Sequence, residues 1–246
     1  MSERVKTVHV GEQGLAAYGP GLHPNELARL ESDLQEALDA WFVEGANPVR
    51  TWDKLLLHVC CGPCAEFPLE VLKRYGGLEV ALFANPNIHP QLEYDRRKAY
   101  AEALLAANDL PMIEVGNSEE ARWRSFPQQS KCAHCRACYP IRMDLAARTA
   151  REHGADAFTT TLAVSPYQDH ELLLAAGEKA AKRHGVRFIP FDFRPGFRIG
   201  QRMARAHQLY RQKYCGCIYS LGESDFSEKI ARDLNLTHSD LPDRTP

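Results

Sequence analysis

Eight cysteines carry most of the chemistry that this sequence could perform. They form three tight groups, Cys60-Cys61-Gly-Pro-Cys64, Cys132-x-x-Cys135-x-x-Cys138 and Cys215-Gly-Cys217. Long cysteine-free stretches separate the groups, which suits an intracellular metal site whose ligands converge in space. A disulfide framework is typical of small secreted domains, whereas this chain has 246 residues.

The spacing leaves several chemistries open. Cys61-Gly-Pro-Cys64 after an apolar segment is a thioredoxin-type redox sequence, but it accounts for only two of the cysteines. A structural zinc ion takes four ligands and leaves several thiols unexplained. An iron–sulfur cluster takes three or four thiolates, and the remaining thiols could bind a second metal or perform redox chemistry. The residues favour a metal site, and iron–sulfur over zinc.

Alternating strand and helix patterns must position these thiols. The apolar run Leu55–Val59 has the composition of a buried parallel strand. The βαβ rhythm predicts an α/β fold with a single doubly wound, mostly parallel sheet, in which sites lie beyond the carboxyl ends of the strands. We expect further strands at Glu79–Ala84, Met112–Val115, Ala157–Thr161 and Val186–Pro190, and helices at Ala65–Arg74, Gln91–Asn108, Pro140–His153 and His170–His184.

Each cysteine group is predicted to meet a local structure that suits a thiolate. The first group follows the first strand and opens a helix, whose dipole stabilises thiolates at its N-terminus. Cys138 stands just before Pro140, a good first-turn residue, so the second group is also expected to precede a helix. In the third group, Gly216 permits a turn that brings Cys215 and Cys217 inward.

The rest of the chain bounds the class of protein. Residues 1–50 are predicted to form an appendage with an amphipathic helix at Asn25–Phe42, residues 51–224 the metal-binding catalytic domain, and residues 225–246 a C-terminal tail. The chain is 44% hydrophobic, and it shows no apolar run of membrane-spanning length and no secretory signal. We therefore expect a cytoplasmic protein without a membrane partner.

A local basic patch offers an anion-binding surface. The net charge of −2 argues against a uniformly basic nucleic-acid binder, but the segment Phe193–Gly222 has no Asp or Glu. If Ile199–Tyr210 is helical, Arg198, Arg202 and Arg205 lie on one face at i, i+4 and i+7, a spacing typical of a phosphate-binding stripe. The alternative is an ordinary solvated helix face, which can have the same pattern of charges. The basic residues of the segment are Arg194, Arg198, Arg202, Arg205, Arg211 and Lys213.

Further polar side chains are expected in loops at the same sheet edge. Asp192 could ligate iron, donate a proton or simply pair with an arginine. His58, inside an apolar strand, is more typical of a satisfied core histidine than of a ligand. The loop residues proposed to contact a substrate, each with the alternative that it only shapes a turn or strand end, are Asn85, Asn87, His89, Thr160, Thr161, Ser165 and Tyr167.

Several of these motifs occur together and in order. The chain from about residue 54 to 222 resembles the QueH family of epoxyqueuosine reductases. The residues that carry the resemblance are Leu55-Leu-Leu-His-Val-Cys-Cys-Gly-Pro-Cys64, Asn85-Pro-Asn-Ile-His-Pro90, Cys135-x-x-Cys138 followed by Arg142, Phe158-Thr-Thr-Thr-Leu162 with Ser165-Pro166, Asp192-Phe193, and Tyr210-Arg-Gln-Lys-Tyr-Cys-Gly-Cys217.

The resemblance implies the last step of queuosine biosynthesis. Epoxyqueuosine at the wobble position of a tRNA would be reduced by two electrons, without cobalamin, and its epoxide oxygen lost as water. It also implies a nucleotide-hydrolase-like fold of the HUP or PP-loop type and a [4Fe–4S] cluster beside a second mononuclear iron. Cys132 departs from the family pattern. The implied ligands are Cys60, Cys61, Cys64, Cys135, Cys138, Cys215 and Cys217.

The implied reaction assigns roles to the remaining residues. Asp192 or a water would supply a proton, the basic segment would bind anticodon-stem phosphates, and Tyr167 or Tyr210 would stack on a base. Electrons would come from a separate donor of unknown identity. Three alternatives remain: a tRNA sulfur transferase on a similar fold, a dithiol oxidoreductase that uses Cys61 and Cys64, and a zinc-stabilised RNA-binding module that keeps the basic patch and needs no redox activity.

Overall fold

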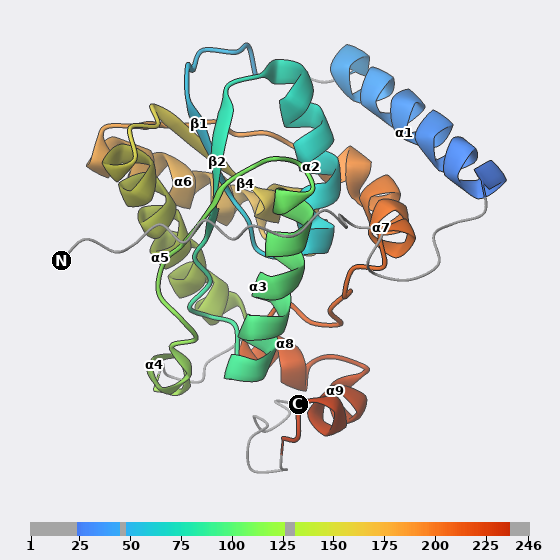
Figure 1. Cartoon of the computed structure of the whole chain (residues 1–246). Helices are drawn as coiled ribbons and strands as arrows, with labels where there is room; N and C mark the ends of the chain where they lie inside the picture. Colours follow the sequence, from blue (N-terminus) through green and yellow to red (C-terminus); the bar gives the residue numbers. More distant parts are fainter. Residues whose placement is uncertain (1–23, 45–47, 126–130, 237–246) are drawn as a thin grey trace.

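The computed structural model describes residues 24–44, 48–125 and 131–236. Its centre is a five-stranded parallel sheet in the order β3-β2-β1-β4-β5 (Figure 1). In the middle strand, Leu57 pairs with Ala81 of β2 and Thr159 of β4. The strands are β1 (Leu55–His58), β2 (Leu78–Phe83), β3 (Met112–Glu114), β4 (Ala157–Thr160) and β5 (Arg187–Phe188).

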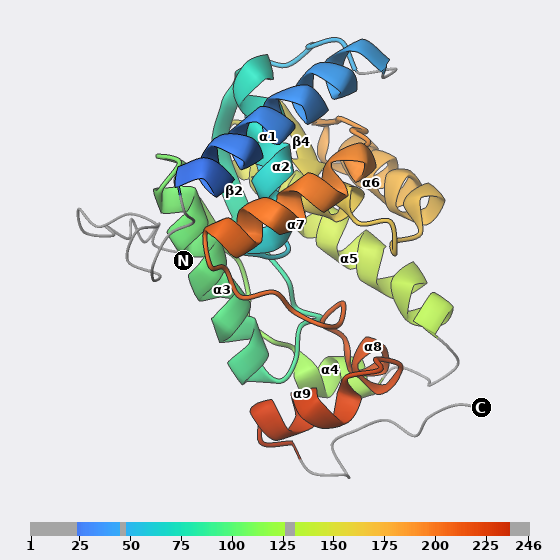
Figure 2. The ribbon, with the colours of Figure 1, turned by 90° about the vertical axis from the view of Figure 1, so that its right-hand side faces the viewer.

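Helices cover both faces of this sheet, as the doubly wound prediction requires. α2, α3 and α7 lie on one side and α5 and α6 on the other (Figures 1 and 2). Leu55, Leu56 and Leu57 are fully buried because β1 is covered on both faces. The helices that flank the sheet are α2 (Gly62–Tyr75), α3 (Gln91–Ala106), α5 (Lys131–Glu152), α6 (His170–His184) and α7 (Phe197–Ala206).

Shorter elements gather beyond the sheet. Helices α4 (Glu120–Arg124), α8 (Ile218–Gly222) and α9 (Ser227–Asp233) lie together at one end of the molecule in both views (Figures 1 and 2). Two 3₁₀ turns, η2 (Thr161–Val164) and η3 (Arg194–Gly196), follow β4 and precede α7. No helix in the described ranges has the length and apolar character needed to cross a bilayer.

The predicted start of one helix is wrong. α5 begins at Lys131 and not at Pro140, which lies inside it. Proline in a helix interior removes one backbone hydrogen bond, yet the residues around it are buried: Cys138, Tyr139 and Arg142 all face the interior. Tertiary packing therefore overrides the local preference of proline, and Cys138 lies within a helix instead of before one.

The basic helix is also shorter than predicted. α7 ends at Ala206, before the expected Tyr210, because Gln208 takes a positive φ of 53° that a helix does not continue through. The third cysteine group is consequently reached by an irregular segment, which returns towards the sheet edge.

The helix expected at Asn25–Phe42 is α1 (Pro24–Glu44), and it packs beside α7 (Figure 2). The indole of Trp41 stacks on Phe193 with 6.2 Å between ring centroids. Its Nε1 donates to the carbonyl of Asp192 at 2.8 Å. Asp33 forms an ion pair with Arg202 of α7 at 2.6 Å. The helix is thus attached to the segment that carries the predicted basic face.

Candidate metal centre

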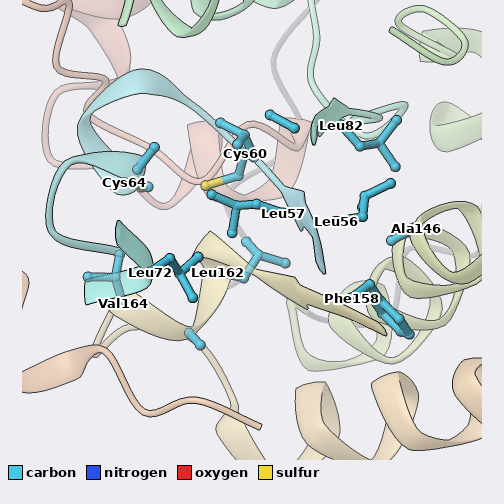
Figure 3. Packing of buried hydrophobic residues seen from close by; sticks show 14 of the residues in the cluster. Leu56, Leu57, Cys60, Cys64, Leu72, Leu82, Ala146, Phe158, Leu162 and Val164 are labelled. Carbon is cyan, nitrogen blue, oxygen red and sulfur yellow. The ribbon is translucent and has the colours of Figure 1, made fainter. Parts of the chain in front are cut away.

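The first cysteine group lies where β1 ends and α2 begins. Cys61 is the N-cap of α2, and Cys64 falls in its first turn. The sulfurs of Cys60, Cys61 and Cys64 all lie within 4.8 Å of one another, and all three residues are buried. Figure 3 shows Cys60 and Cys64 at the margin of the core cluster that contains Leu57 and Leu162. The helix N-terminus favours negative charge on these sulfurs.

Hydrogen-bond donors surround this group. The hydroxyl of Thr161 lies 3.3 Å from Cys60 Sγ and also accepts the Cys60 N–H at 3.0 Å. Gln212 Nε2 lies 2.8 Å from Cys61 Sγ and 3.8 Å from Cys64 Sγ. Hydrogen bonds from Cys61 and Cys64 hold the pKa of Cys60 well below its usual range. Burial raises the pKa of Cys61. These hydrogen bonds therefore favour the thiolate form of Cys60 within the group.

The other described cysteines come from two distant segments, the second and third groups of the sequence, and among the described residues only the sulfurs of the first group converge closely enough to share one metal ion. Cys135 and Cys138 lie one turn apart on α5, and Cys215 and Cys217 flank Gly216 before α8. Burial, with the charges of Cys215 and Cys217, raises the pKa of Cys138 to about 12. Burial and the charge of Cys215 raise the pKa of Cys217 to about 11. These four thiols therefore lie near enough to influence one another. The side chain of Cys132 lies outside the described residues.

The turn at Gly216 depends on glycine. Its φ of 128° is a backbone conformation that other residues rarely adopt. A Cβ there would also lie 2.9 Å from Ile88 Cγ1, in the loop after β2. The predicted turn at Gly216 is therefore present, with Cys217 buried and Cys215 half-buried, and its close packing on the loop at 85–90 is a tertiary feature.

His89 supports this turn directly. Its N–H donates to the Gly216 carbonyl at 3.1 Å, and its Nε2 accepts the Ile218 N–H at 2.6 Å. Its own carbonyl accepts the hydroxyl of Tyr214 at 2.8 Å. Burial, reinforced by the cations Arg124 and Arg97, lowers the pKa of His89 to about 3, so the ring is neutral and able to accept.

Arg97 fastens the same turn from α3. Its guanidinium donates to the carbonyl of Cys215 at 2.8 Å and to that of Tyr214 at 3.1 Å. Its Nε pairs with Glu93 at 2.7 Å, and both side chains are buried. Sequence reasoning missed Arg97 because an arginine in the middle of a predicted helix usually faces solvent.

Arg142 and Asn85 connect the second cysteine group to the first strand. Arg142 Nη1 lies 3.9 Å from Cys138 Sγ, and its Nη2 donates to Asn85 Oδ1 at 2.5 Å. Asn85 Nδ2 in turn donates to the carbonyl of Val59 at 2.9 Å. The neighbouring Asn87 is fully buried, and its side-chain amide has no hydrogen-bond partner among the described residues.

His58 is a core residue, as expected for a histidine inside an apolar strand. Its Nδ1 lies 2.8 Å from Thr160 Oγ1, and its Nε2 lies 3.3 Å from the Ala84 carbonyl. Burial and the nearby Arg142 lower the pKa of His58 to about 3. The neutral ring therefore donates to Ala84 and accepts from Thr160, whose hydroxyl also accepts the Leu162 N–H.

Asp192 pairs with an arginine, the simplest of its three predicted roles. Its carboxylate lies 2.5 Å from Arg194 Nη2 and also accepts the Arg194 N–H at 3.0 Å. Although burial opposes it, these contacts hold the pKa of Asp192 below its usual range. An ionised carboxylate bound in this way has no proton to donate at neutral pH.

The predicted tRNA-binding residues divide into two sets. Tyr210 is already engaged, because its hydroxyl donates to Glu93 at 2.9 Å and Arg96 lies 4.9 Å above its ring. Arg202 is paired with Asp33. Tyr167 is 78% exposed and contacts the ring of Phe197, and its N–H donates to Ser165 Oγ at 3.3 Å. The cations that remain at least partly exposed, with no ion pair to a described residue, are Arg198, Arg205, Arg211 and Lys213.

Sheet and thiols together define a class: an α/β protein that gathers buried thiols at the carboxyl edge of a parallel sheet. Three converging sulfurs fit the donor set of an iron–sulfur cluster. A similar fold occurs in the solved structure of the U34-tRNA thiolase NcsA from Methanococcus maripaludis with its [4Fe-4S] cluster. The likeness has a TM-score of 0.50 and 14% identity, and it covers 88% of this chain and 78% of that one.

Sequence comparison identifies the family. The profile described as epoxyqueuosine reductase QueH matches residues 55–223, as the motif resemblance predicted. A QueH of Streptococcus pyogenes serotype M1 is 30% identical over 81% of this chain and 80% of its own length. One of Dehalococcoides mccartyi is 32% identical over 68% of this chain and 92% of its own length. The chain belongs to the QueH family of epoxyqueuosine reductases.

Proposed function

We propose that this protein reduces epoxyqueuosine to queuosine in tRNA, using iron held by its buried cysteines. The observation that carries the proposal is the family match over residues 55–223, which includes three thiols whose sulfurs lie within 4.8 Å. The reaction consumes two electrons and two protons, converts the epoxide to a double bond and releases water. The enzyme works in the cytoplasm and receives electrons from a separate donor.

The cysteines of the three groups, apart from Cys132, are the proposed ligands of a [4Fe–4S] cluster and a second mononuclear iron. When bound, iron in this setting supplies single electrons and a Lewis acid that polarises a C–O bond. The chain's own contribution is to bury five of the seven proposed ligands, with Cys135 and Cys215 half-buried, and to present hydrogen bonds from Thr161 and Gln212 to the sulfurs of the first group. His89 and Arg97 fix the third group in place.

The tRNA is proposed to bind over the exposed part of α7 and the segment after it. Arg198, Arg205, Arg211 and Lys213 would contact phosphates, and Tyr167 would stack on a splayed base. Arg194, Arg202 and Tyr210 already have partners in the protein, so their contribution is smaller. The buried amide of Asn87, with no partner among the described residues, supports a ligand-binding role for the loop after β2.

The test begins with protein purified without oxygen. Iron and sulfide are measured, epoxyqueuosine tRNA is added with a chemical reductant and no cobalamin, and the tRNA nucleosides are analysed by mass spectrometry. We expect iron with matching sulfide and conversion to queuosine. Cys64→Ser should lose iron and conversion, whereas Cys132→Ser, outside the family pattern, should keep both. Iron-free protein that still converts the substrate would contradict the proposal.

The same experiment tests the sulfur-transferase alternative, because the fold is similar to that of a U34-tRNA thiolase. At 14% identity that likeness concerns the fold alone. The first strand of this chain also runs into Cys60 and Cys61, where a thiolase of this fold would need an ATP-phosphate loop. Thiolated nucleosides in the product, with epoxyqueuosine left unchanged, would favour the transferase.

A further inference from the structure

Arg142 is a buried cation between the cysteine groups. Its side chain is 1% exposed, and it follows Cys138 by about one turn of α5. One end of its guanidinium lies 3.9 Å from Cys138 Sγ, and the other donates to Asn85 at 2.5 Å. Asn85 is tied to the carbonyl of Val59, the residue directly before the first cysteine group. The position of the guanidinium is therefore fixed from both sides.

A buried positive charge needs a negative partner nearby. The chain contains a second buried arginine, Arg97, and that one has the usual solution, a buried carboxylate from Glu93 at 2.7 Å. Arg142 has no such partner, because no carboxylate of the described residues lies within ion-pair distance of it. Asn85 offers only a neutral amide oxygen.

The cysteines are the remaining source of negative charge. Cys138 is in contact with Arg142, and the guanidinium lies near enough to Cys60 and Cys215 for their charges to interact with it. These three residues come from the three separate cysteine groups of the sequence. The guanidinium thus contacts a thiol of the second group and lies near thiols of the other two.

We propose that Arg142 is the counter-ion of the metal-bound thiolates and, as a positioning residue, sets the reduction potential of the centre. A fixed positive charge in a buried site stabilises the more negative, reduced form and so raises the potential. Asn85 fixes the position of this charge, because its Oδ1 accepts a hydrogen bond from Arg142 Nη2. The inference rests on the iron–sulfur centre of the proposed function.

The experiment compares three variants in the iron-loaded protein by anaerobic redox titration. Arg142→Gln removes the charge, and Arg142→Lys keeps it but loses the planar fork. Arg148→Gln removes a charge from an exposed position on the same helix. We expect Arg142→Gln to reduce the equilibrium constant for one-electron reduction at least tenfold, a fall of about 59 mV. The other two variants should remain close to the wild type.

Each outcome decides the question. Arg142→Gln that binds iron with an unchanged potential overturns the inference. If Arg142→Gln does not retain iron, Arg142→Lys decides: retained iron with a near-normal potential supports the role of the charge, whereas loss of iron in both overturns it in favour of a purely structural role. Wild-type protein without iron would contradict the proposed function itself, which is a separate result.

Discussion

At the scale of single residues, the side chains that neighbour the cysteines matter as much as the cysteines. Gln212 and Thr161 donate hydrogen bonds to sulfurs of the first group, and Arg142 contacts the second. Hydrogen bonds and charges at this distance tune both the affinity for a metal and its potential. All three lie in motifs of the sequence, but their contacts with the cysteine sulfurs are visible only in the folded structure.

A prediction at this scale concerns His89. Its pKa in the folded protein is about 3, below the usual value of 6.5. As the pH falls below about 6.5, the unfolded chain therefore binds a proton at this histidine and the folded protein does not, so the free energy of unfolding decreases. Between about pH 7.5 and about pH 5.5, this residue should account for a loss of about 1.4 kcal/mol. His89→Gln, whose amide oxygen can still accept from Ile218, should flatten the dependence measured by urea unfolding.

The control for this experiment is His153→Gln, which changes an exposed histidine at the end of α5. It should retain the wild-type pH dependence. A slope that His89→Gln leaves unchanged would show that other groups cause the acid sensitivity.

At the scale of elements, the arginines of α7 differ in their partners. Arg202 is paired with Asp33 of α1, while Arg198 and Arg205 are exposed with no ion pair to a described residue. α1 lies outside the part of the chain that matches the family, yet it contacts the segment that leads into α7 through Trp41. Arg198, Arg202 and Arg205 lie on this one helix, but the periodicity of the sequence does not indicate that Arg202 is paired with a residue of another helix.

The prediction for this element compares two of these arginines. Arg198→Ala should weaken binding of the tRNA and reduce the slope of log K against log salt by about 0.7 to 0.9, the value for one phosphate contact. Arg202→Ala should change both less, since its partner is Asp33. Filter-binding or anisotropy across a salt series measures the two. Equal effects of both variants would mean that the ion pair opens when tRNA binds.

At the scale of the whole molecule, the site joins segments that are far apart in the sequence. The loop after β2, the middle of α3 and the turn at Cys215–Cys217 meet through His89 and Arg97. The third cysteine group has no regular element of its own before α8, and therefore depends on these contacts for its place.

We predict that Arg97 is essential for this assembly. Arg97→Gln removes the buried cation closest to Glu93, which keeps the Tyr210 hydroxyl at 2.9 Å and Arg96 at 4.0 Å. The free energy of unfolding should therefore fall by about 3 kcal/mol, the lower end of the range for a broken buried ion pair. Arg148→Gln, which removes an exposed arginine, should cost about 0.5 kcal/mol or less. Chemical denaturation of both variants gives the comparison. Stability of Arg97→Gln within about 1 kcal/mol of the wild type would contradict the assigned role.

The sequence by itself determined the succession of strands and helices along the chain, the positions of the cysteine groups and the family. Apolar runs such as Leu55–Val59 and the full helix His170–His184 follow from periodicity and capping, which act over a few residues. Motifs specify the family for a similar reason, because each keeps its chemistry within a short segment. The predicted boundary at Pro140 is wrong because packing overrides the local preference of proline, and the one at Tyr210 is wrong because the chain turns at Gln208, whose φ is positive.

Only the tertiary structure decided which side chains share the site. Asp192 and Arg202 carry the right chemistry for catalysis and tRNA binding, but each has a partner that the sequence does not reveal. Arg97 resembles an ordinary surface arginine in the sequence, and Arg142 appears there only as part of a motif; the fold buries the first beside backbone carbonyls and the second beside Cys138. Burial and long-range contact are properties of the folded chain, since they depend on segments that meet only when the sheet has formed.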